Sequence, residues 1–360
     1  MRGSADLSRN NLDFLRLVLA STVFLFHVHA LTNIPAFWTF AKFLSAPFAV
    51  KSFFVISGLL IYRSCVRSSS ISSYFEKRVR RIYPAYFTVV VLAALLLFPL
   101  STQSVSQYFG IGFWKYLGSN LIFLNFLAPS LPGVFTFNSI PAVNGALWTL
   151  KIEVAFYLFI PIMHYLCSRF ETKRLMTALF FLSCLWKYGF AFLDSVTTSH
   201  SAYSLDSSRS IYSQLEVQFP GQLMYFVAGI LILLFFDNLK HHFGLIAGLT
   251  IFLYVIDHLF MRDNLDVLWI SGIVFVVGFW RYLGNFSKYG DFSYGVYIVH
   301  WPILQILIYL GFASKLAPPA FLLLSVILVA VASALMWYVV ESKFLATSSH
   351  YRQVSKASPA

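Results

Sequence analysis

The sequence predicts an all-α polytopic membrane protein with about ten transmembrane helices. Three observations predict this class. Of the 360 residues, 59% are hydrophobic and only 11% are charged, and the mean hydropathy is +0.74. A soluble domain carries about 25% charged residues, so the composition excludes an ordinary soluble protein. The apolar residues also gather in runs of roughly 17–25 residues, which is the length of helix that crosses a bilayer.

Ten apolar runs are predicted to span the membrane as helices. In chain order they are about 12–31, 47–63, 82–100, 146–167, 175–193, 220–236, 243–260, 266–281, 292–312 and 318–340. The first run follows arginines, as the core of a signal peptide does, but its length and His27 favour an uncleaved span. The segment 108–131 is interrupted by asparagine, glycine and proline, so we expect a loop that re-enters the membrane or lies on its surface.

The basic residues agree with ten spans. With a cytoplasmic N-terminus, 17 of the 26 lysines and arginines fall in inner segments, 5 in outer segments and 4 within spans. This is the positive-inside bias, and ten spans place both termini in the cytoplasm. Topology therefore explains the net charge of +12, and we predict no nucleic-acid partner. The three cysteines lack CxxC spacing, and the sequence predicts neither a disulfide framework nor a metal site.

We expect one membrane domain over residues 1–345 and a short cytoplasmic tail over 346–360, with no appended soluble domain. The two largest outer joints are 101–145 and 194–219, and the second is rich in serine and threonine. Such joints either meet a polar partner outside the cell or are plain surface loops.

The first span carries ionisable residues that need an explanation. At the centre of a bilayer such a side chain costs about 2.5–3.5 kcal/mol, so it generally faces protein or a water-filled cavity. Asp13 and Arg16 are three residues apart and are predicted to pair near the inner surface. His27 follows Arg16 by three helical turns, so both project from one face about 16 Å apart along the axis. A packed, hydrogen-bonded histidine is the alternative to a functional one.

The stretch 74–87 contains four basic residues, among them Arg78 and Arg81 at i and i+3. Arginine pairs suit phosphate groups, although a routine cytoplasmic flank explains the same charges. Pro84 is expected to end or kink the helix here.

Glu153 lies in the fourth predicted span and has no basic residue one turn away on its own helix. It is expected to pair with Arg16, with an arginine of the 78–81 group or with His27, or else to stay protonated.

The ninth predicted span has Tyr294, Tyr297 and His300 spaced by threes. For the tyrosines we favour a packing face or an interfacial aromatic belt. His300 lies near the middle of the span and is a candidate for lining a cavity.

These segments resemble the acyltransferase-3 family of integral membrane acyltransferases. The resemblance covers nearly the whole chain and rests on five motifs in the family's order. They are Arg16 and His27 with ten residues between them, "FFVISG" at 53–58 with Ser57, the RxxR of Arg78 and Arg81, the W-x4-E of Trp148 and Glu153, and "SYGVYIVHWP" at 293–302 with Tyr297 and His300. The family includes bacterial O-acetyltransferases that act on lipopolysaccharide O-antigen and other surface glycans.

The resemblance implies an O-acetyltransferase of the stand-alone kind in the bacterial inner membrane. Its partners would be cytoplasmic acetyl-CoA as donor, a free or lipid-linked glycan as acceptor, and the surrounding membrane lipid, with no metal. Its catalytic residues would be His27, Arg16 and Glu153, and its donor-binding residues would be Arg78, Arg81, Ser57, Trp148, Tyr297 and His300. A histidine general base and an acetyl-histidine intermediate are both open. The alternatives are a secondary transporter with an Arg/His/Glu proton relay and a scaffold without chemistry.

Overall fold

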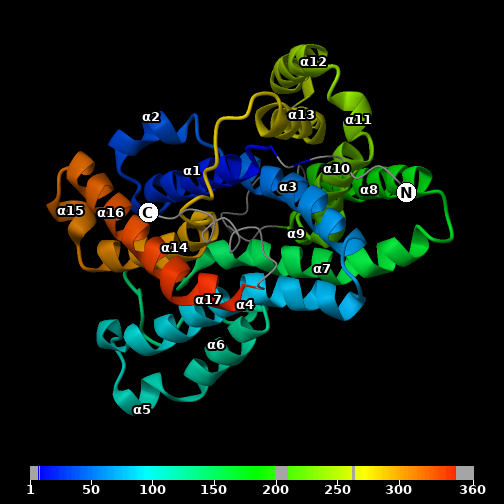
Figure 1. Cartoon of the computed structure of the whole chain (residues 1–360). Coiled ribbons are helices and arrows are strands. Elements are labelled where there is room, and N and C mark those ends of the chain that lie inside the picture. The colour runs from blue at the N-terminus through cyan, green and yellow to red at the C-terminus, as the bar shows by residue number, and fades with distance from the viewer. Residues whose placement is uncertain (1–6, 8, 199–209, 262–263, 346–360) are drawn as a thin grey trace. The chain divides into compact units, whose positions relative to one another are not determined.

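A computed structural model of the chain describes residues 7, 9–198, 210–261 and 264–345, and all regular structure within these ranges is helical. Figure 1 shows the helices of the whole chain. The chain divides into two compact units. Unit 1 comprises Met1–Leu12, Lys51–Tyr74 and Ile152–Leu283, and unit 2 comprises Asp13–Val50, Phe75–Lys151 and Gly284–Ala360. The predicted tail 346–360 and the centre of the outer joint 194–219 lie outside the described residues.

Eight helical segments of the described chain are long and apolar enough to cross a membrane, so the protein is a polytopic membrane protein. They are Leu12–Thr32, Pro35–Val66, Ile71–Leu96, Gly145–Leu166, Thr172–Thr197, Ile211–Leu234, Phe243–Met261 and Pro318–Phe344. The other two predicted spans are also helical but shorter. They correspond to α13 (Asp266–Phe279, 14 residues) and α14 (Ser293–Tyr309, 17 residues). The all-helical class is confirmed. Helix length alone supports eight of the ten predicted transmembrane helices in the described residues.

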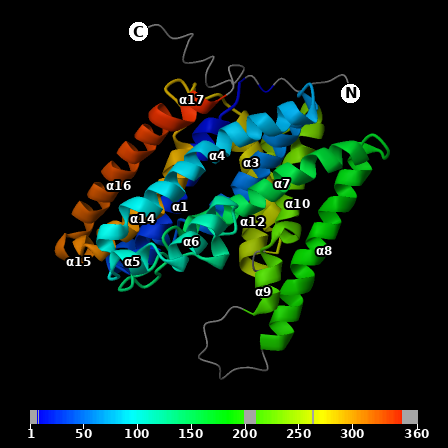
Figure 2. The ribbon, with the colours of Figure 1, turned by 90° about the horizontal axis from the view of Figure 1, so that it is seen from below.

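Unit 2 contains four long helices: α1 (Leu12–Thr32), α4 (Ile71–Leu96), α14 and α16 (Pro318–Leu335). Helix α14 packs against α16, and the ribbons of these helices run alongside one another (Figure 2). A Cβ atom at Gly295 of α14 would lie 3.1 Å from backbone atoms of Ser333, so the small residue permits the close approach. The short elements are η1 (Pro35–Phe37), α2 (Trp38–Ala41), η2 (Phe98–Leu100), α5 (Val105–Tyr108), α6 (Ile111–Leu121), η3 (Asn125–Leu127), η4 (Gly145–Leu147), α15 (Phe312–Lys315), the π-helix η6 (Met336–Glu341) and α17 (Ser342–Phe344).

Two sequence-based boundaries in unit 2 are wrong. Helix α4 runs over Ile71–Leu96, so it begins before the predicted span 82–100, and Pro84 lies inside the helix rather than ending it. The segment 108–131 is not a loop throughout, since it contains α6, which at 11 residues is too short to span a bilayer. The Tyr86 hydroxyl of α4 donates to the Asn120 carbonyl oxygen at 2.6 Å, which holds α6 against α4.

Unit 1 is built from α3 (Ala46–Val66), α7 (Trp148–Leu166), α8 (Thr172–Thr198), α9 (Ile211–Glu216), α10 (Phe219–Leu234), α11 (Phe236–Leu239), α12 (Phe243–Ile256), the π-helix η5 (Asp257–Met261) and α13. Helices α3 and α10 meet at two glycines. A Cβ atom at Gly58 would lie 1.8 Å from the Phe226 carbonyl oxygen, and one at Gly229 would lie 1.9 Å from the Val55 carbonyl oxygen. Only glycine permits this backbone approach, which is how membrane helices commonly pack.

A cluster of polar side chains joins four helices inside unit 1. The Asp266 carboxylate pairs with Lys51 of α3 and, at 3.3 Å, with Lys187 of α8. The Tyr225 hydroxyl of α10 donates to the same carboxylate at 2.6 Å and lies 2.7 Å from Lys187 Nζ. Two of the lysines predicted within spans are therefore satisfied by a buried aspartate.

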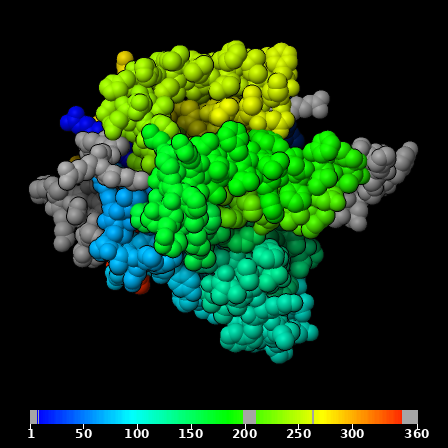
Figure 3. All heavy atoms as spheres, turned by 90° about the vertical axis from the view of Figure 1, so that its right-hand side faces the viewer, coloured from blue at the N-terminus to red at the C-terminus, as the bar shows by residue number. Residues whose placement is uncertain are grey.

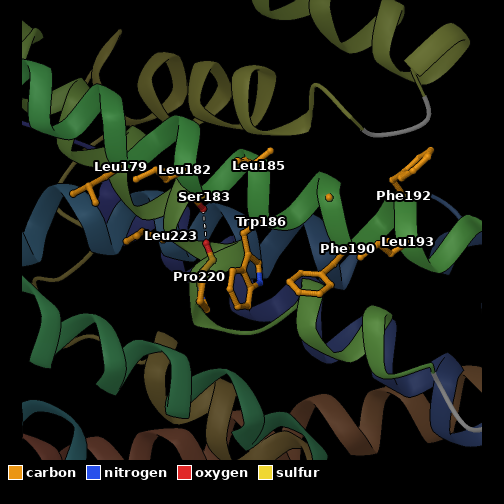
Figure 4. A pocket seen from close by; sticks show the side chains of 11 residues that line it. Leu179, Leu182, Ser183, Leu185, Trp186, Phe190, Phe192, Leu193, Pro220 and Leu223 are labelled. Carbon is orange, nitrogen blue, oxygen red and sulfur yellow. Dashed lines mark hydrogen bonds between the residues drawn. The ribbon is translucent and has the colours of Figure 1, made fainter.

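Helix α8 presents an apolar face, shown in green in Figure 3, on which Phe181, Leu182 and Leu185 are each more than 60% exposed. An apolar groove of about 640 Å³ runs between α8 and α10 (Figure 4). Two lining side chains carry polar atoms, and both bond to backbone: the Ser183 hydroxyl donates to the Pro220 carbonyl oxygen at 2.5 Å, and the Trp186 indole donates to the Leu215 carbonyl oxygen at 3.0 Å. The groove offers no group for acid–base chemistry, and its composition suits contact with lipid.

Candidate active site

Two histidines from distant parts of the sequence meet in unit 2. His27 Nδ1 lies 2.9 Å from His300 Nε2, and the two rings are stacked with centroids 5.2 Å apart and 8° between their planes. His300 is fully buried, whereas His27 is half-buried. Helix α1 contributes the first and α14 the second, so the Arg-x10-His and SYxxYxxHxP motifs come together at these rings. We call them the histidine pair.

Arg16 and Arg81 share one carboxylate in the same unit. Arg16 Nη1 lies 2.6 Å from Asp291 Oδ2, and Arg81 Nη2 pairs with that same oxygen. Arg81 Nη1 also contacts Glu341 Oε2 at 3.1 Å. The two carboxylates are 2% and 1% exposed, so Arg16, Arg81, Asp291 and Glu341 form a buried ion network. Asp13, the partner predicted for Arg16, lies 4.0 Å away.

Asp291 precedes α14 and is held ionised by its surroundings. Burial by itself would raise the pKa of the Asp291 carboxyl, but the guanidinium groups of Arg16 and Arg81 outweigh burial. Ser293 adds hydrogen bonds from its backbone N–H, at 3.1 Å, and from its hydroxyl. The net result is a pKa well below the usual value for aspartate.

The two carboxylates of the network were not among the residues proposed from the sequence. Asp291 stands two residues before the serine of the SYxxYxxHxP motif, and Glu341 directly follows the last predicted span. Glu341 is also the only acidic residue after Asp291 in the sequence, which is the signal that could have identified it. It ends the π-helix η6, a form of helix that is frequent at functional sites.

Pro302 of the SYGVYIVHWP motif leaves a carbonyl oxygen of α14 free to bind the segment that precedes η4. Pro302 has no N–H, so the Ile298 carbonyl oxygen lacks its normal helical donor. The side-chain amide of Asn144 donates to that oxygen at 2.8 Å. Trp301 donates to the Ala142 carbonyl oxygen at 3.1 Å and packs edge-on against His27, with centroids 4.8 Å apart. These hydrogen bonds hold the end of the predicted outer joint 101–145 against α14, next to the histidine pair.

The tyrosines of the motif are engaged in packing, as the sequence favoured. Tyr294 donates to the Ile82 carbonyl oxygen at 3.1 Å. The Tyr297 hydroxyl lies 2.5 Å from Thr149 Oγ1, and the residue is 7% exposed. Trp148, next to Thr149, is 39% exposed, and Arg78 is half-buried on α4.

Ser57 and Glu153 belong to unit 1. Ser57 is half-buried beside Gly58, whose contact with α10 gives the FFVISG motif a packing role. Glu153 Oε1 accepts a hydrogen bond from the Tyr157 hydroxyl at 2.6 Å. This neutral donor one turn along α7 is not among the charged partners expected for Glu153 from the sequence.

Comparison with known proteins gives a consistent set of relatives. A family model described as an acyltransferase domain matches residues 9–338. The chain is 27% identical over 326 residues to nodulation protein 10 of Rhizobium leguminosarum bv. viciae, which covers 85% of this chain and 86% of that protein. It is 28% identical over 355 residues to an O-acetyl transferase of Shigella phage Sf6, with 94% and 97% covered. Acyltransferase MdmB of Streptomyces mycarofaciens is 27% identical over 127 residues, 35% of this chain and 30% of that protein. No solved structure matches the chain.

Proposed function

Because the chain belongs to the acyltransferase-3 family, we propose that it is a membrane O-acetyltransferase that moves an acetyl group from cytoplasmic acetyl-CoA to a hydroxyl of a cell-surface glycan. Family membership makes the protein an acyltransferase. Acetyl-CoA as donor, a glycan hydroxyl as acceptor and a location in the inner membrane are what we propose. The observation that carries it is the family match over residues 9–338, which includes both histidines of the pair. The similarity to the phage O-acetyl transferase over nearly its whole length supports an acetyl donor.

Ten spans with both termini in the cytoplasm are part of this proposal, and two contacts within unit 2 support them. Arg16 near the start of α1 contacts Asp291 just before α14, and His27 further along α1 contacts His300 further along α14. The two helices therefore run in the same direction, so α14 leaves the cytoplasm if α1 does.

Six of the eight long segments lie between α1 and α14 in the sequence, and six crossings after α1 leave the chain outside. Helix α14 can start from the cytoplasm only if α13 carries the chain back across the membrane. The two shorter helices are then both spans, which gives ten and returns the C-terminus to the cytoplasm. The single membrane domain over 1–345 stays a prediction.

His27 is the proposed catalytic group. As a base it removes the proton from the acceptor hydroxyl, the oxygen attacks the thioester carbonyl, and the C–S bond breaks as CoA thiolate leaves. The imidazolium then returns the proton to the thiolate. Attack by His27 itself, followed by transfer from an acetyl-histidine, is the alternative order. The His27 ring packs against His300 and Trp301 but the residue is not fully buried, which suits either role.

The donor's phosphates are proposed to meet the RxxR pair on α4. Arg78 and Arg81 are both proposed to contact these phosphates, and Arg81 also holds the buried carboxylates of Asp291 and Glu341. Arg16 stands about 16 Å from His27 along α1, too far to act on the same atom, so we propose that it acts at the other end of an extended donor. We retain a donor-binding role for Ser57, Trp148 and Tyr297. We also retain a catalytic role for Glu153, exerted through the hydroxyl of Tyr157 that it binds.

Detergent-purified protein incubated with acetyl-labelled acetyl-CoA tests the proposal. We expect label to leave the thioester, and the Arg78→Ala variant to raise KM for acetyl-CoA about 10-fold while Lys343→Ala, a nearby cytoplasmic-side control, leaves it unchanged. A transporter or a scaffold would leave the thioester intact. NMR of the surface glycan from cells with and without the gene identifies the acceptor, and unchanged O-acetyl resonances would contradict a glycan acceptor.

A further inference from the structure

We infer that His300 is a positioning residue that determines which ring nitrogen of His27 is basic. The inference rests on the proposed role of His27 as the base. It is carried by a chain of two hydrogen bonds that runs from the backbone of α14 through His300 to His27.

The first bond fixes the proton on His300. Its Nδ1 lies 3.0 Å from the carbonyl oxygen of Val296, one turn earlier on α14. A carbonyl oxygen can only accept, so Nδ1 carries the hydrogen. The ring is fully buried, and a second proton would place an unpaired charge there. The neutral ring therefore presents a lone pair at Nε2, an assignment that follows from the hydrogen-bond network.

The second bond fixes the proton on His27. Since His300 Nε2 is an acceptor, the 2.9 Å contact requires His27 Nδ1 to be the donor. In a neutral imidazole only one nitrogen carries hydrogen, so the lone pair of His27 is at Nε2. No residue in the described part of the chain forms a hydrogen bond with that nitrogen. His27 is thus presented as the tautomer that can take a proton at Nε2.

The surrounding rings hold this arrangement in place. Trp301 packs edge-on against His27, and Phe24 and Tyr297 pack edge-on against His300 with centroids 6.2 Å and 6.1 Å away. Neither imidazole can turn over without displacing these neighbours. Holding the base in the correct tautomer is the role that a carboxylate fills in hydrolytic triads, where its loss lowers kcat by several orders of magnitude. Here a buried neutral histidine would fill it.

This role differs from the donor-binding role that the family resemblance implied for His300. The side chain is 0% exposed and both of its nitrogens are already bonded within the protein. It therefore reaches the substrate only through His27.

Two replacements of His300 separate hydrogen bonding from packing. His300→Gln places an amide oxygen, an acceptor, near the position of Nε2, while His300→Phe fills the ring space without an acceptor. We expect His300→Phe to lower kcat about 100-fold, at the lower end of the 10²–10⁴-fold effect of a positioned base, with KM for acetyl-CoA within about 2-fold of wild type. His300→Gln should recover at least about 10-fold of that loss.

The outcomes distinguish this inference from the proposed function. If His27→Ala is inactive but His300→Phe keeps the wild-type kcat, the positioning role is wrong and the proposed function stands. If Gln and Phe at 300 lower kcat equally, the acceptor is not what matters, and the inference is again overturned. If His27→Ala keeps full activity, the base assignment itself fails.

A direct reading of the tautomer in the wild-type protein does not depend on the activity of any variant. Nitrogen-15 NMR of histidine-labelled wild-type protein, with His27→Ala used to assign the signal, should show His27 protonated at Nδ1 and bare at Nε2. A His27 signal protonated at Nε2 would overturn the inference.

Discussion

Replacing Asp291 with asparagine removes a carboxylate that Arg16 and Arg81 share. The Asp291 side chain is 2% exposed, so water replaces little of what is lost. Arg81 still contacts Glu341 at 3.1 Å, and Arg16 still lies 4.0 Å from Asp13. Removing one partner of a buried ion pair costs about 3–5 kcal/mol, because the remaining charge is uncompensated. At roughly 2–4 °C per kcal/mol, the melting temperature should fall by at least about 6 °C.

The assay is thermal unfolding of the detergent-purified protein followed by tryptophan fluorescence, with Glu76→Gln as the matched control. Glu76 Oε1 lies 2.7 Å from Arg80 Nη2 on the same helix as Arg81, but the two side chains are 58% and 46% exposed. An exposed pair at this distance contributes about 1 kcal/mol or less, so the control should barely shift the transition. If the melting temperature fell equally in Asp291→Asn and Glu76→Gln, the buried ion network would contribute no more to stability than an exposed pair, and the reasoning would be refuted.

Three further predictions concern stability. Asn144→Ala leaves the buried Ile298 carbonyl oxygen without its donor and should cost about 1–3 kcal/mol, measured by the same unfolding assay; an unchanged transition would contradict the assigned bond. Gly58→Ala would place a Cβ atom 1.8 Å from the Phe226 carbonyl oxygen, so we expect poor yield or a lower melting temperature, and a wild-type transition would refute the close approach. The folded-state pKa of Asp291 is lowered, so its stabilisation is complete above the unfolded pKa of about 3.9 and is lost as the pH falls toward the folded value; the melting difference between wild type and Asp291→Asn should therefore shrink below about pH 4.

The sequence predicted local features of the fold well, because they follow from periodicity and hydropathy. The 3.6-residue repeat placed Arg16 and His27 on one face of α1, and both face α14 in the structure. The apolar runs located the helices, but hydropathy does not mark where an amphipathic helix begins. That is why the start of α4 was misplaced and α6 was missed.

The distant partners of Arg16 and Arg81 could not be predicted, because they are set by long-range packing, whereas the predicted local pair of Asp13 and Arg16 is present at 4.0 Å. Arg81 is 210 residues from Asp291 and 260 residues from Glu341 along the chain, and no local pattern links them. Glu153 illustrates the opposite error, since its donor Tyr157 is one turn away and was overlooked in favour of distant cations. Motif resemblance identified the histidines, whereas only the structure shows that they contact each other.

The central claim is that His27 performs acyl transfer, and the most direct measurement is the rate at which purified His27→Ala transfers or releases the acetyl group of labelled acetyl-CoA. With the variant shown to be folded by its elution volume and melting temperature, we predict a rate about 10²–10⁴-fold below wild type. A folded His27→Ala protein that turns over acetyl-CoA at the wild-type rate would contradict the account.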